Sequence, residues 1–193
     1  MNDDKKFLHN TLEGENKLFP YGDLFPKINK TVFLAPGSKI VGDVEIDEDS
    51  SVWYNCVVRG DVNFVKIGKM TNIQDLSMLH VTNGKFPLII GNKVTVGHSV
   101  TLHGCKLKDL CLIGMGAVVL DGAVIEERSM VAAGAVVRPG FFVPTGKLAA
   151  GVPASIVRDL SEEEIEEFEI SAKRYVSYTK TTVDSLIKSG YKF

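Results

Sequence analysis

Aliphatic residues recur along this chain at intervals of six, usually with a small or β-branched residue four positions later. The seventeen aliphatic positions are Leu34, Ile40, Ile46, Val52, Val58, Ile67, Ile73, Leu79, Ile90, Val96, Leu102, Leu107, Ile113, Val119, Ile125, Val131 and Val137. An amphipathic helix needs a period of about 3.6 residues and a half-buried strand a period of about two, so neither explains the pattern. The pattern instead predicts an all-β solenoid, a parallel β-helix in which short strands turn every few residues.

A different pattern begins after the last repeats. Ser161 and Glu164 have the spacing of a capping box, in which each side chain bonds the backbone N–H of the other residue. Beyond them, apolar residues recur mostly at spacings of three and four. These features predict a C-terminal α-helix whose apolar stripe packs on the side of the solenoid.

Length and composition restrict the domain organisation and the partners. The chain has 193 residues, is 45% hydrophobic and carries a net charge of -2. We expect one domain over residues 1–193, with an irregular lead-in segment at 1–30, the β-helix at 31–153 and the helix at 160–188. The balanced charge argues against a nucleic-acid or acidic membrane surface. No segment reads as a signal sequence or a membrane span, so we expect a cytoplasmic protein.

Six polar motifs lie within residues 52–104. They are Trp53-Tyr54-Asn55, Val58-Arg59-Gly60-Asp61, Asn72-Ile73-Gln74-Asp75, Leu79-His80, Gly97-His98 and Leu102-His103-Gly104. The six-residue repeat alone does not identify a family, because many acyltransferases contain it. The ordered set of polar motifs, however, resembles the γ-class carbonic anhydrase family. The resemblance implies a left-handed β-helix with coils of eighteen residues. It also implies a homotrimer with metal sites at its interfaces, and reversible hydration of CO2 to bicarbonate.

An eighteen-residue coil allows the motif residues to be assigned to faces of the solenoid. Two intervals between successive aliphatic positions are longer than six residues, one by three residues and the other by five. When these extra residues are set aside, Arg59, His80 and His103 fall in one column. Asp75 and His98 stack on a different face, which directs His98 away from the other two histidines. We therefore expect one subunit to supply His80 and His103 and its neighbour to supply His98, in a closed ring of three.

Three histidines with an open fourth position are a known arrangement for catalytic zinc. His80, His98 and His103 are accordingly predicted to bind Zn²⁺, with Fe²⁺ or Co²⁺ as alternatives. A metal on three neutral imidazoles generates hydroxide near neutral pH, and this hydroxide would attack CO2. The competing interpretation of a histidine is an ordinary surface or hydrogen-bonded residue, and we expect this role for His9.

Three charged residues are predicted to support this site. Arg59 and Asp61 are expected to form an ion pair that helps to set the register between subunits. Asp75 is expected to bond His98 and thereby fix which ring nitrogen carries the proton.

Three further residues are candidates for catalytic roles. Asn72 and Gln74 are predicted to orient metal-bound water or bicarbonate, with hydrogen bonding inside the coil as the alternative. The family resemblance implies a tyrosine from the C-terminal helix near the metal, and Tyr175 is that candidate. Its competing interpretation is a place in the apolar stripe of the helix.

The chain departs from active members of the family at two places. Residues 81–87, just after His80, contain no Asp or Glu, whereas the best-known active members carry an acidic residue in this loop. Val62 replaces a family glutamate. These departures leave metal binding intact and keep two alternatives open. One is a hexapeptide-repeat acyltransferase that uses a histidine as general base, and the other is a weakly catalytic metal-binding or assembly trimer.

Overall fold

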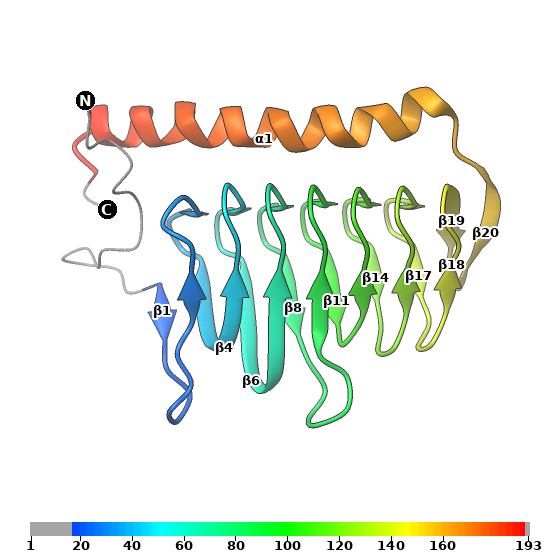
Figure 1. The fold of residues 1–193 in the computed structure, drawn as a ribbon, viewed down its shortest axis with the longest axis horizontal. Coiled ribbons are helices and arrows are strands. Elements are labelled where there is room, and N and C mark those ends of the chain that lie inside the picture. Colours follow the sequence, from blue (N-terminus) through cyan, green and yellow to red (C-terminus); the bar gives the residue numbers. More distant parts are fainter. Residues whose placement is uncertain (1–16, 192–193) are drawn as a thin grey trace.

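The computed structural model describes residues 17–191 and shows a parallel β-helix with one long C-terminal helix (Figure 1). This confirms the predicted fold class. The predicted surface role of His9 and the first half of the lead-in segment lie outside the described residues.

The strands form two sheets. The first contains β1 (Leu18–Phe19), β2 (Lys27–Ile28), β4 (Lys39–Ile46), β6 (Val57–Ile67), β8 (Met78–His80), β9 (Leu88–Ile90), β11 (Thr101–His103), β12 (Lys106–Leu107), β14 (Val118–Val119), β15 (Val124–Ile125), β17 (Val136–Val137) and β18 (Phe142–Val143). The second contains β3 (Phe33–Leu34), β5 (Ser51–Val52), β7 (Asn72–Ile73), β10 (Thr95–Val96), β13 (Leu112–Ile113), β16 (Met130–Val131), β19 (Lys147–Gly151) and β20 (Ala154–Asp159).

The long strands β4 and β6 run around a corner, so the first sheet supplies two of the three faces of the solenoid. Face 1 consists of β8, β11, β14 and β17 with the first halves of β4 and β6. Face 2 consists of β9, β12, β15 and β18 with the second halves of β4 and β6. Face 3 is the second sheet.

The aliphatic repeat forms the interior. All seventeen positions are at most 3% exposed and belong to one continuous cluster. Parallel pairing stacks each aliphatic residue on its equivalents in adjacent coils, so its side chain is removed from water on all sides. The three cysteines are free and buried, and burial raises the pKa of Cys56 to about 11 and those of Cys105 and Cys111 to about 12.

The lead-in segment is more regular than expected where the structure describes it. β1 and β2 both pair in parallel with β4 and so extend the first sheet. Ile28 packs on the core, and it lies six residues before Leu34 in the aliphatic repeat. The expectation of an irregular lead-in was therefore wrong for residues 17–30, because the first coil of the solenoid needs partners for its backbone N–H and C=O groups.

Helix α1 (Glu162–Lys188) runs back along the solenoid to its N-terminal end (Figure 1). It packs on face 3 against β5 and β10, with Phe168, Ala172 and Val183 buried. Two polar contacts fix it there: Ser171 Oγ lies 3.1 Å from Thr95 Oγ1, and Lys93 donates to Glu169 at 2.9 Å. The predicted packing of the helix on the solenoid is confirmed. Within the described part of the chain, no helix is long and apolar enough to span a membrane.

The start of α1 gives a pH-dependent prediction. Hydrogen bonds from Arg158 and from the Ser161 backbone lower the pKa of Glu164 to about 2, against about 4.3 in an unfolded chain. A depressed pKa stabilises the fold above the unfolded value, and this stabilisation is lost as the pH falls towards 2. Glu164→Gln should therefore lower the melting temperature at pH 7 but not at pH 2. Glu163→Gln, in the same turn but outside the capping box, serves as the control; equal shifts at both pH values would contradict the assignment.

Candidate metal site

The two histidines of face 1 lie side by side. His80 ends β8 and His103 ends β11, and these residues are paired in register. The residues before them, Leu79 and Leu102, point into the core, so both imidazoles project outward. His80 Nδ1 lies 3.1 Å from His103 Nε2, and the ring centroids are 5.1 Å apart. The stacking predicted from the coil length is present.

The far nitrogen of each ring lies against a carboxylate. His80 Nε2 is 3.1 Å from Asp61 Oδ1, and His103 Nδ1 is 2.9 Å from Asp121 Oδ1. Asp61 also accepts a hydrogen bond from Arg59, so the predicted ion pair is present and the same carboxylate reaches His80. Burial raises the pKa of Asp61, but the hydrogen bonds from His80 and Arg59 outweigh it and keep the pKa below its ordinary value.

Asp121 is a partner that the sequence analysis missed. Burial raises the pKa of its carboxyl, but hydrogen bonds from Thr82 and His103 outweigh it and leave the pKa below its usual value. Asp121 follows His103 by eighteen residues, which is one coil of the solenoid. That spacing is the signal from which this residue could have been found.

His98 lies at a different place, on the corner that leads from face 3 to face 1. It follows β10, and its Nδ1 is 2.8 Å from Asp75 Oδ2. The other oxygen of Asp75 accepts a hydrogen bond of 3.1 Å from the Tyr54 backbone N–H. Asp75 and His98 are thus paired as expected, with the His98 side chain 45% exposed.

The paired histidines have the geometry of two metal ligands. Each has one ring nitrogen on a carboxylate, which leaves His80 Nδ1 and His103 Nε2 facing each other. Two ligand nitrogens of a tetrahedral zinc, each about 2.0–2.1 Å from the metal, lie about 3.3 Å apart. The 3.1 Å separation fits such a pair. Among residues 17–191 of a single chain, no three His, Cys, Asp or Glu side chains gather as a complete metal site.

Asn72 and Gln74 lie on face 3, beneath α1. Gln74 Nε2 donates to Asn72 Oδ1 at 3.1 Å, and Asn72 Nδ2 donates to Thr95 Oγ1 at 3.0 Å. Thr95 in turn contacts Ser171 of the helix. The structure therefore places both amides in a buried network and pairs them with each other; their predicted contact with water or bicarbonate stays a prediction.

Tyr175 packs within an aromatic group at the side of face 3. Its ring centroid is 5.6 Å from that of Trp53 and 5.6 Å from that of Tyr178, both in edge-on geometry. Burial, and after it the negative charge of Asp75, raise the pKa of Tyr175. Tyr175 thus belongs to the surroundings of the His98–Asp75 pair, and its catalytic role stays a prediction.

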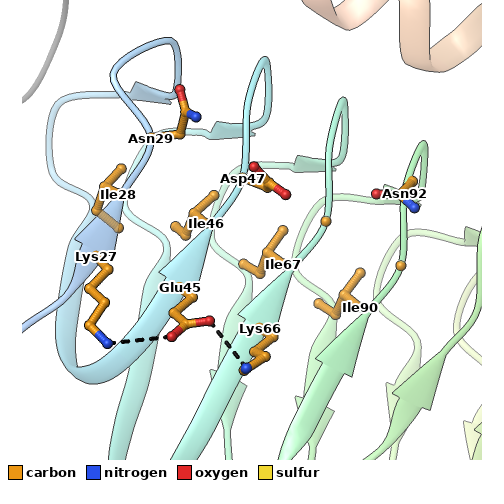
Figure 2. A pocket seen from close by; sticks show the side chains of 12 residues that line it. Lys27, Ile28, Asn29, Glu45, Ile46, Asp47, Lys66, Ile67, Ile90 and Asn92 are labelled. Carbon is orange, nitrogen blue, oxygen red and sulfur yellow. Dashed lines mark ion pairs between the residues drawn. The ribbon is translucent and has the colours of Figure 1, made fainter.

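A separate groove lies on face 2 (Figure 2). It runs along the ends of β2, β4, β6 and β9, and two lysines on its rim, Lys27 and Lys66, share the carboxylate of Glu45 at 3.6 and 3.2 Å. No histidine lines this groove. It is therefore distinct from the candidate metal site.

The fold and these pairs define a hexapeptide-repeat β-helix protein with two converging, carboxylate-bound histidines. No family model matches the chain. It is 48% identical over 154 residues to a "Probable carbonic anhydrase" of Methanocaldococcus jannaschii, with 80% of this chain and 96% of that protein covered. It is 44% identical over 172 residues to "Gamma carbonic anhydrase 2, mitochondrial" of Arabidopsis thaliana, with 86% of this chain covered. The chain spans 62% of the length of that plant protein.

A similar solved structure is a "hexapeptide transferase family protein" from Anaplasma phagocytophilum. It is 41% identical, with a TM-score of 0.82, and the match covers 85% of this chain and 96% of that one. The sequence relatives show that this chain belongs to the γ-carbonic anhydrase family.

Proposed function

We propose that this chain is a metal-dependent γ-carbonic anhydrase that reversibly hydrates CO2 to bicarbonate at sites between the subunits of a homotrimer. The observation that carries the proposal is the convergence of His80 Nδ1 and His103 Nε2 at 3.1 Å, while the opposite nitrogen of each ring lies against a carboxylate. Such carboxylate–histidine pairs are typical of metal ligands, because the carboxylate fixes the tautomer and makes the ligand nitrogen more basic.

His80 and His103 of one subunit and His98 of its neighbour would hold the metal, with zinc first and iron or cobalt as alternatives. Bound there, the metal would supply a Lewis acid that activates water near neutral pH. Asp61 would hold the imidazole of His80, and Asp75 that of His98, in the required tautomers. Asn72, Gln74 and Tyr175 are proposed to act on the substrate side.

Face 1 is the surface that a neighbouring subunit would cover. His98 lies at one of its edges and the His80–His103 pair at the other, so a ring of three chains can bring one edge against the next. Apolar side chains on and beside this face are exposed: Leu76 by 63%, Met115 by 60% and Met78 by 43%. Their burial between subunits would stabilise the ring.

The proposal predicts metal-dependent hydration of CO2. Removal of the metal with a chelator should reduce the activity of freshly purified protein to background, and added zinc should restore it. Because residues 81–87 contain no acid, proton transfer to buffer should limit the rate. Activity should therefore rise across a buffer series from about 5 to 100 mM, a range that covers more than a tenfold change in proton acceptor. Absence of hydration by fully metal-loaded protein at every buffer concentration would contradict the proposal.

A second candidate is an acyl transfer reaction, because many acyltransferases contain six-residue repeats and the Anaplasma phagocytophilum relative is named as a member of a hexapeptide transferase family. There a single histidine would act as general base and take a proton from an acceptor group, which attacks the thioester as the thiol leaves. Such an activity would survive removal of the metal, so the chelation experiment distinguishes the two reactions. A trimer that binds metal but shows neither activity would be the third candidate, an assembly protein.

A further inference from the structure

A chain of hydrogen bonds links His103 to the loop that follows His80. Thr82 Oγ1 donates to Asp121 Oδ1 at 2.6 Å, and His103 Nδ1 lies 2.9 Å from the same oxygen. The Asp121 side chain is 28% exposed. Thr82 and His103 are 21 residues apart in sequence. One oxygen of the Asp121 carboxylate therefore joins two separate segments of the chain.

Gly104 makes room for this carboxylate. A Cβ atom at position 104 would lie 2.4 Å from Asp121 Oδ1 and 2.7 Å from Phe86 Cβ, closer than real Cβ contacts. The backbone of Gly104 also has φ of +53°, which favours glycine. The turn after His103 is thus shaped so that Asp121 can reach the imidazole.

Thr82 is held in place by contacts other than Asp121. Its carbonyl accepts a hydrogen bond from Asn63 Nδ2 at 3.1 Å, and it forms a bridge with Phe86 across the loop. Gly84 N donates to the Val62 carbonyl at 3.3 Å, which fixes the loop against β6. Thr82 can therefore act as a fixed donor that orients Asp121.

We infer that Asp121 is the positioning residue for His103, and that Thr82 holds Asp121 in this role. The inference deepens the proposed metal site and rests on it. With Nδ1 bonded to Asp121, the His103 proton resides on Nδ1 and the Nε2 lone pair faces His80. Without Asp121, the ring would lose its preferred tautomer and its fixed orientation.

The first test needs no metal. Nitrogen-15 NMR of the His103 ring in metal-free protein at alkaline pH should show the Nδ1–H tautomer. Asp121→Ala should shift His103 towards a mixture of tautomers, Thr82→Val should produce a smaller shift, and Thr82→Ser should resemble the parent protein. Asp109→Ala is the matched control, because Asp109 occupies a similar turn but bonds Asn92 and no histidine.

The second test is zinc affinity, measured by competition with a chelator. Asp121→Ala should weaken binding by about 10–100-fold, as is typical of residues that orient metal ligands. Thr82→Val should weaken it less, while Thr82→Ser and Asp109→Ala should bind zinc as the parent protein does. Melting temperatures would show that each variant is folded.

Two results would overturn the inference: an unchanged His103 tautomer in Asp121→Ala, or zinc affinity equal to that of the parent protein. Failure of the parent protein itself to bind zinc, iron or cobalt would contradict the proposed function. The tautomer measurement would still decide whether Asp121 positions His103, so the two failures are distinguishable.

Discussion

Replacement of His80, His98 or His103 with alanine is expected to weaken metal binding by more than about 100-fold, because loss of a ligand costs more than the 10–100-fold typical of residues that only orient one. CO2 hydration should fall to background in each variant. Metal analysis of purified protein and competition with a chelator would measure the change. The effect should be equally severe for His98, although it lies apart from the other two histidines in a single chain.

His9→Ala is the control for this series. His9 lies outside the resemblance motifs, so its replacement should leave metal content unchanged. If His98→Ala retained the metal content of the parent protein while His80→Ala and His103→Ala lost theirs, His98 would not be a ligand.

Replacement of Ile113 with alanine is expected to lower the free energy of unfolding by about 2–5 kcal/mol, the range for deletion of a fully buried aliphatic side chain. Ile113 has no exposed surface and lies between Val96 and Val131 of the adjacent coils. A smaller side chain would leave a cavity in this column. Denaturant unfolding at a fixed protein concentration would measure the loss, because assembly couples stability to concentration.

Lys108→Ala provides the comparison, since Lys108 is exposed one residue after the inward Leu107. Its replacement should change the free energy of unfolding by less than about 0.5 kcal/mol. Similar losses for the two variants would show that the aliphatic column does not dominate stability.

The aliphatic repeat made the fold predictable, because each aliphatic position specifies a side chain that points into the core. Inward side chains every six residues require the chain to turn between them. The same counting predicted that His80 stacks on His103 and Asp75 on His98, since both pairs are set by coil length alone.

Other parts of the site depended on features that a repeat does not encode. Asp121 is one of many turn aspartates in the sequence, and its role requires the space above Gly104. Thr82 lies in the loop that interrupts the six-residue repeat after His80, where counting along the repeat assigns no face of the solenoid. The network of Asn72 and Gln74 depends on where α1 crosses face 3. The strands of the lead-in segment form because β4 offers an open edge.

The central claim is that each metal site is shared between two chains, and metal content of a mixed trimer tests it most directly. His80→Ala and His98→Ala chains would be co-expressed in equal amounts. At some interfaces of the mixed trimers, a His98→Ala chain, which keeps His80 and His103, would then lie beside a His80→Ala chain, which keeps His98. Random assembly should restore about a quarter of the sites, because each interface needs one particular ordered pair of chains. Metal content near a quarter of the parent value, with both single variants empty, is the predicted result. No recovery above the single variants, in trimers shown to contain both chains, would contradict the shared site.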